Sequence, residues 1–313
     1  MELLTNFADE LKQSELRNKV LALVPAFHKL RDLGSSLIPK EDSPSARDRI
    51  IAYLRNYPQR IIDGDELMVV SGIGEWARRL RELRVQFGWW IYSGVTFRDI
   101  AEDDGAGFEA ASIFEELGFN PLSVKPDQYV LLRAVQDRDA SFRWNSLNDL
   151  RKSKLSVKDK ILSFLRQNVG KEISGEELKY LANDKSEWAR RSRELRTEEG
   201  WPVKTKSSGR PDLSVGVYVL ERDYQSPPHD RKIPDDVRVE VLTRDKFQCV
   251  NPTCGWSRDE LNPDDPRTML ELHHVHEHGK GGQNVTSNLA TLCNVCHDKV
   301  HRNALKVLDT WYL

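Results

Sequence analysis

Two segments of this 313-residue chain repeat each other closely, and this constrains its fold more than any other feature. Residues 47–91 and 158–203 align with a single one-residue gap. Within them, the nonapeptides that start at Trp76 and Trp188 read WARRLRELR and WARRSRELR, and they differ at one position only. Self-similarity over this length indicates a duplicated structural unit. We therefore predict that the chain contains the same small fold twice.

The pattern within each copy predicts helices first and strands afterwards. In the second copy, Ile161, Leu162 and Leu165 recur at helical spacing and give the first helix an apolar face. Ser174 and Glu177 have the spacing of a capping box, which opens a second helix. The first copy has the same features at matching positions, so both copies are expected to begin with two helices.

A third helix and a hairpin complete each copy. Trp188, Ser192 and Leu195 stand at i, i+4 and i+7, which predicts a core-facing stripe on this helix. Residues 201–205 and 215–220 then read as two strands joined by a polar turn. Three helices followed by a hairpin resemble the winged-helix variant of the helix-turn-helix fold.

The first copy carries an insertion. Its second strand is displaced to residues 129–132 by a longer segment, which includes a predicted helix near residues 108–117. We therefore expect the first repeat to extend over residues 46–135 and the second over residues 157–222.

Basic side chains cluster on the third helix of each copy and on the turn of the second copy. In a winged helix the third helix commonly enters a DNA groove. The side chains predicted to contact DNA are Arg78, Arg79, Arg81, Arg190, Arg191, Arg193, Lys204, Lys206 and Arg210. Arg84 and Arg196 end the two nonapeptides and are expected to be exposed as well. The same pattern also fits an ordinary solvated helix, because glutamates stand four residues from arginines, and winged helices also bind proteins.

Three segments lie outside the repeats. Residues 136–156 and 223–233 are polar and read as linkers. Residues 1–45 look largely helical, and Pro25 is expected to kink or interrupt this helix. Its apolar face comprises Leu16, Val20, Leu23, Phe27 and Leu30. This segment could pack on the first repeat or mediate dimerisation.

The composition excludes a membrane protein and favours a cytoplasmic one. No run of 18 apolar residues exists in the sequence. The first residues, MELLTNFADELKQ, contain acids where a signal peptide needs basic residues and an apolar stretch. The formal net charge of −2 argues neither for nor against a nucleic-acid partner.

All four cysteines lie between positions 249 and 296, which indicates metal binding rather than disulfides. Cys249 and Cys254 form one pair, and Cys293 and Cys296 form the other. Four thiolates are the ligand set of a closed tetrahedral zinc site, which does no chemistry. We expect a structural Zn²⁺ that holds the two ends of a small domain together.

The histidines of residues 270–301 need a different explanation. This tract, LELHHVHEHGKGGQNVTSNLATLCNVCHDKVH, contains a histidine pair, a glycine-bearing loop, Asn288 and a C-x-x-C-H-x-x-x-H pattern. These features in this order resemble the HNH endonuclease family, whose domain has a ββα-metal fold. The resemblance covers about residues 234–302, so we assign residues 234–313 to a nuclease domain.

The resemblance implies a role for several residues. His273 would be a metal ligand, His274 would be the general base, and Asn288 would brace the loop that carries the base. His297 would be the second metal ligand, and His301, one helical turn further on, a third. His276 and His278 match no family position, and Lys280 could contact the DNA backbone or be solvated. The catalytic ion would be Mg²⁺ or Mn²⁺, but an all-imidazole ligand set is softer and also tolerates Co²⁺, Ni²⁺ or Zn²⁺, which leaves the preference for Mg²⁺ open.

We thus predict an α+β multidomain protein that is a metal-dependent endonuclease acting on double-stranded DNA. The winged-helix modules would select the site in a restriction or defence enzyme, including types that require a modified base. A non-catalytic DNA-binding regulator and a nuclease for RNA or branched DNA are the alternatives. Cutting both strands usually requires two nuclease domains, so a homodimer is plausible.

Overall fold

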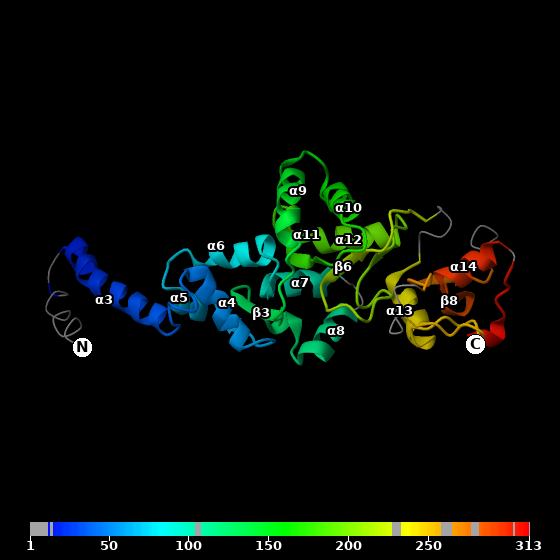
Figure 1. Ribbon diagram of the computed structural model, residues 1–313, viewed down its shortest axis with the longest axis horizontal. Helices are drawn as coiled ribbons and strands as arrows, with labels where there is room; N and C mark the ends of the chain where they lie inside the picture. Colours follow the sequence, from blue (N-terminus) through cyan, green and yellow to red (C-terminus); the bar gives the residue numbers. More distant parts are fainter. Residues whose placement is uncertain are drawn as a thin grey trace. The chain divides into compact units, whose positions relative to one another are not determined.

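The computed structural model describes residues 12, 15–103, 108–226, 233–257, 265–276, 282–302 and 304–312. Helices and small antiparallel sheets make up the chain, so the predicted α+β class is confirmed (Figure 1). Contacts divide it into two compact units. Unit 1 comprises Met1–Gly94 and Lys125–Trp144, and unit 2 comprises Val95–Val124 and Asn145–Leu313.

The first repeat, in unit 1, consists of three helices and a three-stranded antiparallel sheet with the order β1-β3-β2. Its elements are α4 (Ala46–Asn56), β1 (Ile62–Asp63), α5 (Gly64–Ser71), α6 (Trp76–Arg81), β2 (Trp90–Ser93) and β3 (Gln128–Arg133). A capping box opens α4, because the Ser45 hydroxyl accepts from the Asp48 N–H (3.1 Å) and the Ser45 N–H donates to the Asp48 carboxylate (3.2 Å). A π-helical turn, η1 (Glu82–Gln86), extends α6.

One long helix, α3 (Leu16–Ser36), precedes this repeat. It runs through Pro25 without a break, so of the expected kink or interruption the interruption does not occur. Its last turns pack on α5: Arg31 donates two hydrogen bonds to the carbonyl oxygen of Gly72 (3.1 and 3.0 Å). Gly34 lies so close to Val69 that a Cβ there would be 2.5 Å from the Val69 carbonyl oxygen. The end of α3 is therefore anchored to the first repeat, whereas its earlier apolar side chains are exposed.

The second repeat, in unit 2, has the same arrangement, with the sheet order β4-β6-β5. Its elements are α10 (Val157–Gln167), β4 (Ile173–Ser174), α11 (Gly175–Leu181), α12 (Trp188–Thr197), β5 (Val203–Lys204) and β6 (Val217–Leu220). The predicted capping box of Ser174 and Glu177 is confirmed, as is the buried stripe on α12. Each repeat also has a short strand before its second helix, β1 or β4, which was not predicted. Two residues are too few for an alternating pattern to appear in the sequence.

The insertion of the first repeat groups by its contacts with unit 2, whereas the rest of that repeat lies in unit 1. It contains α7 (Gly94–Asp103) and α8 (Phe108–Leu117), so the helix predicted near residues 108–117 is confirmed. The Asp99 carboxylate of α7 accepts from Lys179 Nζ (2.8 Å) and from Trp188 Nε1 (2.9 Å). These buried contacts tie the insertion to the core of the second repeat.

The segment predicted as a linker over residues 136–156 contains a helix, α9 (Ala140–Lys152). Ala140, Arg143 and Leu147 are buried at i, i+3 and i+7 on one face, and this burial stabilises the helix. The predicted linker over residues 223–233 is described only in part, because residues 227–232 lie outside the described residues.

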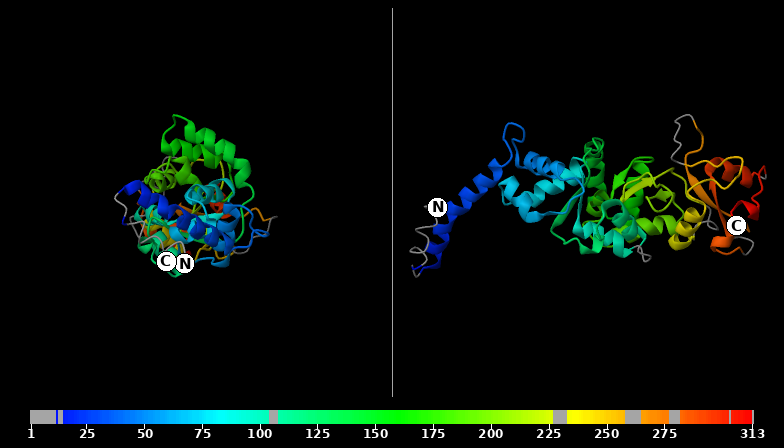
Figure 2. Two further views of the ribbon diagram at one scale, coloured as in Figure 1. Left: turned by 90° about the vertical axis from the view of Figure 1, so that its left-hand side faces the viewer. Right: turned by 90° about the horizontal axis from the view of Figure 1, so that it is seen from below.

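The C-terminal part of unit 2 is a hairpin between helices (Figure 1, Figure 2). Its elements are α13 (Asp235–Arg244), β7 (Leu270–His274), β8 (Leu289–Cys293) and α14 (Asn294–His301). β7 and β8 pair antiparallel, with Leu270 opposite Cys293 and His274 opposite Leu289. Short 3₁₀ turns within the described residues include η5 (Thr286–Asn288) and η6 (Asp309–Trp311) here and η2 (Pro121–Ser123) after α8. Among the described residues, no helix is long and apolar enough to cross a membrane.

Candidate active site

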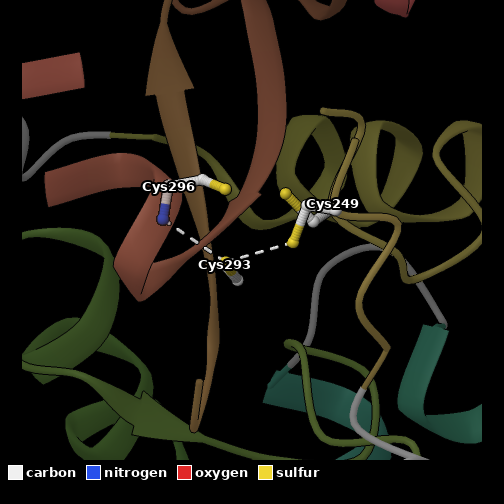
Figure 3. A group of neighbouring side chains, drawn as sticks. Cys249, Cys293 and Cys296 are labelled. Carbon is white, nitrogen blue, oxygen red and sulfur yellow. Dashed lines mark hydrogen bonds between the residues drawn. The ribbon is translucent and has the colours of Figure 1, made fainter. Parts of the chain in front are cut away.

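The four cysteines converge on one point. Cys249 and Cys254 lie on the loop after α13, Cys293 ends β8, and Cys296 lies in the first turn of α14. Their sulfur atoms all lie within 4.8 Å of one another, and three of the side chains can be seen pointing together in Figure 3. The Cys254 and Cys293 sulfurs are 3.8 Å apart. Two sulfurs on one tetrahedral zinc ion are separated by about 3.8 Å, so the cluster fits zinc.

The surroundings of these sulfurs suit thiolates. The Cys296 sulfur accepts from Asn251 Nδ2 (3.3 Å), and the Cys293 sulfur accepts from the Cys296 N–H (3.4 Å). Without a cation, burial raises the pKa of Cys296 to about 11. A hydrogen bond with Cys249, together with burial, also raises the pKa of Cys293. A metal ion would reverse this preference, because a coordinated thiol loses its proton.

Three histidines form a second, separate cluster. His273 projects from β7, whereas His297 and His301 share one face of α14 because they stand four residues apart. One ligand nitrogen from each ring lies within 4.8 Å of the other two. The Nε2 atoms of His297 and His301 are 3.1 Å apart. Two imidazole ligands of one tetrahedral ion would be about 3.4 Å apart, so these rings are directed at a common point.

A carboxylate orients this triad, and the sequence analysis missed it. Glu271 Oε2 lies 2.9 Å from His297 Nδ1, which leaves His297 Nε2 directed at the other rings. Burial favours the neutral form of Glu271, but the hydrogen bond and charge of His297, with Arg222, outweigh it and hold the pKa of Glu271 below its usual value. Glu271 stands two residues before His273 on the same face of β7, so strand alternation could have identified it.

His274 lies on the opposite face of β7 and is only 5% exposed. Its Nε2 atom is 2.6 Å from the side-chain oxygen of Asn284, a second residue that the sequence analysis missed. Because Asn284 follows no periodic pattern in its loop, the sequence offers no signal for it. The two adjacent histidines of the tract, His273 and His274, therefore lie in different surroundings.

Asn288 bridges the two ends of the loop between β7 and β8. Its side-chain oxygen accepts from the His276 N–H (2.8 Å), and its amide nitrogen donates to the carbonyl oxygens of His276 (3.0 Å) and Gln283 (2.9 Å). These are the backbone bonds expected of a bracing residue. His276 is exposed, and His278 and Lys280 lie outside the described residues.

The residues predicted to contact DNA lie in two different environments. Arg78 and Arg190 are 65% and 61% exposed, although each lies near a glutamate of its own helix. Arg81 is exposed, and Arg79, Arg191 and Arg193 are half-buried. Arg79 pairs with Glu82, and Arg191 with Glu187 and Glu194. Arg84, also expected to be exposed, is half-buried.

The expected exposure of the basic turn in the second repeat is wrong. Lys204 is 6% exposed, and its Nζ donates to the carbonyl oxygen of Leu270 (3.3 Å). Arg210 is buried in ion pairs with Asp212 and Glu221, and Lys206 pairs with Glu116 of the insertion. The side chain of Arg196 is buried too, because it pairs with Asp235. The partners of Lys204, Lys206 and Arg196 are distant in the sequence, so the local pattern cannot reveal these contacts.

Comparison with protein families shows what the histidine tract belongs to. Residues 252–303 match the family model of the HNH endonuclease. The chain contains an HNH endonuclease domain. Upstream of this HNH domain, residues 47–132 and 158–221 match the model of the KpnI N-terminal domain, KpnI being a restriction enzyme. Searches of curated proteins and of solved structures returned no match.

These two family matches test several of the predictions made from the sequence. The HNH domain is confirmed, and together the two matches support a nuclease in restriction or defence. The cysteine cluster of the HNH domain could hold zinc.

Proposed function

We propose that this protein is a metal-dependent DNA endonuclease in which His274 is the general base. The single observation that carries the proposal is the separation of the two histidine environments across β7. His273 joins His297 and His301 in one cluster, whereas His274 faces Asn284 on the other side of the strand. The four cysteines form a separate group of metal ligands, so the histidines are not needed to complete a zinc site.

The residues of the chain fit phosphodiester hydrolysis. A divalent cation held by His273, His297 and His301 would polarise the phosphate and stabilise the charge on the departing oxygen. When His274 Nε2–H donates to the Asn284 oxygen, Nδ1 is the basic nitrogen of the ring. Nδ1 takes a proton from water as the water oxygen bonds to phosphorus, and the phosphorus bond to the leaving oxygen breaks. An imidazole suits this step because it titrates near neutral pH.

The ligand set also bears on which ion is used. Three imidazole nitrogens form a softer site than the oxygen ligands that Mg²⁺ prefers. We propose that Mn²⁺, Co²⁺, Ni²⁺ and Zn²⁺ support cleavage at least as well as Mg²⁺. The test is cleavage of genomic DNA after chelation and after addition of each ion. Cleavage that persists in the chelator, or that no divalent ion restores, would count against the proposed function.

We also propose that the two repeats are winged-helix modules that contact DNA. The support is their element order, helix–strand–helix–helix–strand–strand, with the last strand in the middle of each sheet. Arg78, Arg81 and Arg190 are exposed side chains of their third helices. Replacing Arg78 and Arg190 by Gln should reduce the salt dependence of DNA binding, because fewer counterions are released. An unchanged salt slope would redirect these helices to protein contacts.

A homodimer accords with double-strand cleavage, because the described residues of one chain contain a single histidine triad. We propose that α3 forms its interface. Its exposed apolar residues, Leu16, Val20, Leu23, Phe27 and Leu30, alternate four and three residues apart, which is the spacing of a coiled-coil seam. Pro25 falls away from this seam. Phe27→Asp should convert the dimer to a monomer in sedimentation equilibrium, and a dimer that persists would exclude α3 as the interface.

A further inference from the structure

Unit 2 contains a cavity of about 620 Å³ whose lining includes two histidines of the triad, His297 and His301. The second repeat contributes Arg196 of α12 and Lys204 of β5 to its lining. The HNH part of unit 2 contributes Arg238 of α13 and, from α14, His297 and His301. The cavity is therefore formed jointly by the second repeat and the nuclease domain, and it reaches two of the metal-ligating rings.

Two carboxylates near this cavity, Glu271 and Asp235, are already engaged. Glu271 contacts Arg222 and His297, and Asp235 contacts Arg196 through both oxygens. Arg238 Nε lies 3.9 Å from Asp235, which is beyond hydrogen-bonding distance. Lys204 donates to a neutral carbonyl oxygen. Asp298, the other carboxylate of the lining, is exposed.

Several buried donors in the lining have no acceptor among the described residues. They are Trp201 Nε1, Arg222 Nε and Arg238 Nε. A buried N–H group without an acceptor is destabilising, so three of them around one cavity are unexpected unless a ligand satisfies them. All three are donors, and a ligand that satisfies them must offer acceptors.

The cations of the cavity also disfavour one another. Burial and the charge of Arg238 lower the pKa of Lys204 to about 7 against the opposing effects of Glu271 and Glu221, and Arg196 contributes to the lowering. Burial lowers the pKa of Arg238 to about 10, against the effect of Asp235, and Arg196 lowers it as well. An anion in the cavity would relieve this repulsion. Its required features are negative charge and several acceptor oxygens, which a phosphate group has.

We propose that this cavity binds a phosphate group of the DNA strand that is cut. Its donors would be Lys204, Arg238 and the indole N–H of Trp201. The proposal rests on the proposed nuclease function. A strand phosphate is favoured over a free one because the lining includes His297 and His301, where the reacting phosphate must also lie. Since the cations come from both the second repeat and the HNH domain, an occupied cavity would couple DNA engagement by the repeat to placement of the strand for cutting.

The first experiment uses the full-length protein and inorganic phosphate as the probe. At constant ionic strength, phosphate should raise the melting temperature of the wild type, because it binds the folded state. Lys204→Met should need about tenfold or more phosphate for the same rise in melting temperature, since a charge-assisted contact is lost. An apolar side chain of similar length suits a buried position, so this variant should fold. Lys154→Met, at an exposed lysine of the same unit, should respond as the wild type does. Equal responses in all three proteins would overturn the proposal.

The second experiment identifies the source of the phosphate. Without added divalent ion, phosphate should compete with a mixed-sequence DNA duplex for the wild type, and Lys204→Met should bind the duplex more weakly. Phosphate that stabilises the protein without displacing DNA would show a site for free phosphate and would overturn the strand assignment. Arg238→Met should also bind the duplex more weakly. The competition is measured in the wild type, so its outcome does not depend on the folding of either variant.

Neither readout requires cleavage. If the competition occurs but no divalent ion supports cutting, the cavity assignment stands and the nuclease proposal fails. If cutting occurs but phosphate has no effect on stability or DNA binding, the cavity assignment fails alone.

Discussion

A carboxylate oxygen of Glu271 lies 2.9 Å from Nδ1 of His297, on the side of the ring away from His301. This contact sets the orientation of one member of the histidine triad before any ion binds. It belongs to a common arrangement in metal sites, in which a second group holds the ligating imidazole. The triad is thus preorganised by β7, which supplies both Glu271 and His273.

Replacing Glu271 by Gln should weaken binding of the catalytic ion about 10–100-fold, because the imidazole loses its charged partner. Titration of cleavage rate against Mn²⁺ concentration measures this effect, and zinc content should remain that of the wild type. Glu240→Gln, at an exposed position of α13, is the matched control. Equal Mn²⁺ dependence in both variants would show that Glu271 does not support the triad.

Replacing Asn284 by Ala should lower kcat about tenfold or more while KM stays nearly constant, because the imidazole of His274 loses the bond that fixes its orientation. Single-turnover cleavage at saturating DNA checks this. Asn284→Asp should recover part of the rate, since a carboxylate oxygen can accept the same hydrogen bond. If alanine at position 284 leaves kcat intact, the 2.6 Å contact has no role in catalysis.

Replacing Cys254 by Ser should abolish zinc binding at the cysteine cluster and lower the melting temperature, because the four sulfurs link the loop after α13 to α14. Metal analysis of the purified protein together with thermal melting measures both effects. His273→Ala should keep the zinc, since the histidines form a separate cluster. Loss of the ion from the four sulfurs in the histidine variant would mean that the two clusters share it.

Lys204 should make stability depend on pH. Its pKa is about 7 in the folded state, against an ordinary value of 10.5. Between these values the unfolded chain binds one more proton than the folded chain, so the free energy of unfolding rises with pH. From pH 7 to pH 9 the wild type should gain about 2 kcal/mol relative to Lys204→Met. Denaturant unfolding of both proteins in phosphate-free buffer measures the difference, and a constant difference would indicate an unshifted lysine.

Much of the site could be predicted from the sequence because its spacing follows simple geometry. Strand alternation separates His273 from His274, and a four-residue step on a helix aligns His297 with His301. The burial of Lys204 could not be predicted, since its carbonyl partner on Leu270 is 66 residues away in the chain. Asn284 was missed because loop contacts leave no periodic trace. The short strands β1 and β4 were missed because their pairing depends on a later strand, β3 or β6.

The central claim is that His274 accepts the proton of the attacking water. The most direct measurement compares His274→Ala with His276→Ala, a nearby exposed histidine, for Mn²⁺-dependent DNA cleavage, DNA affinity and zinc content. We predict that His274→Ala loses cleavage by about 10²-fold or more and keeps affinity and zinc, whereas His276→Ala cuts as the wild type does. Wild-type cleavage by His274→Ala would contradict the account.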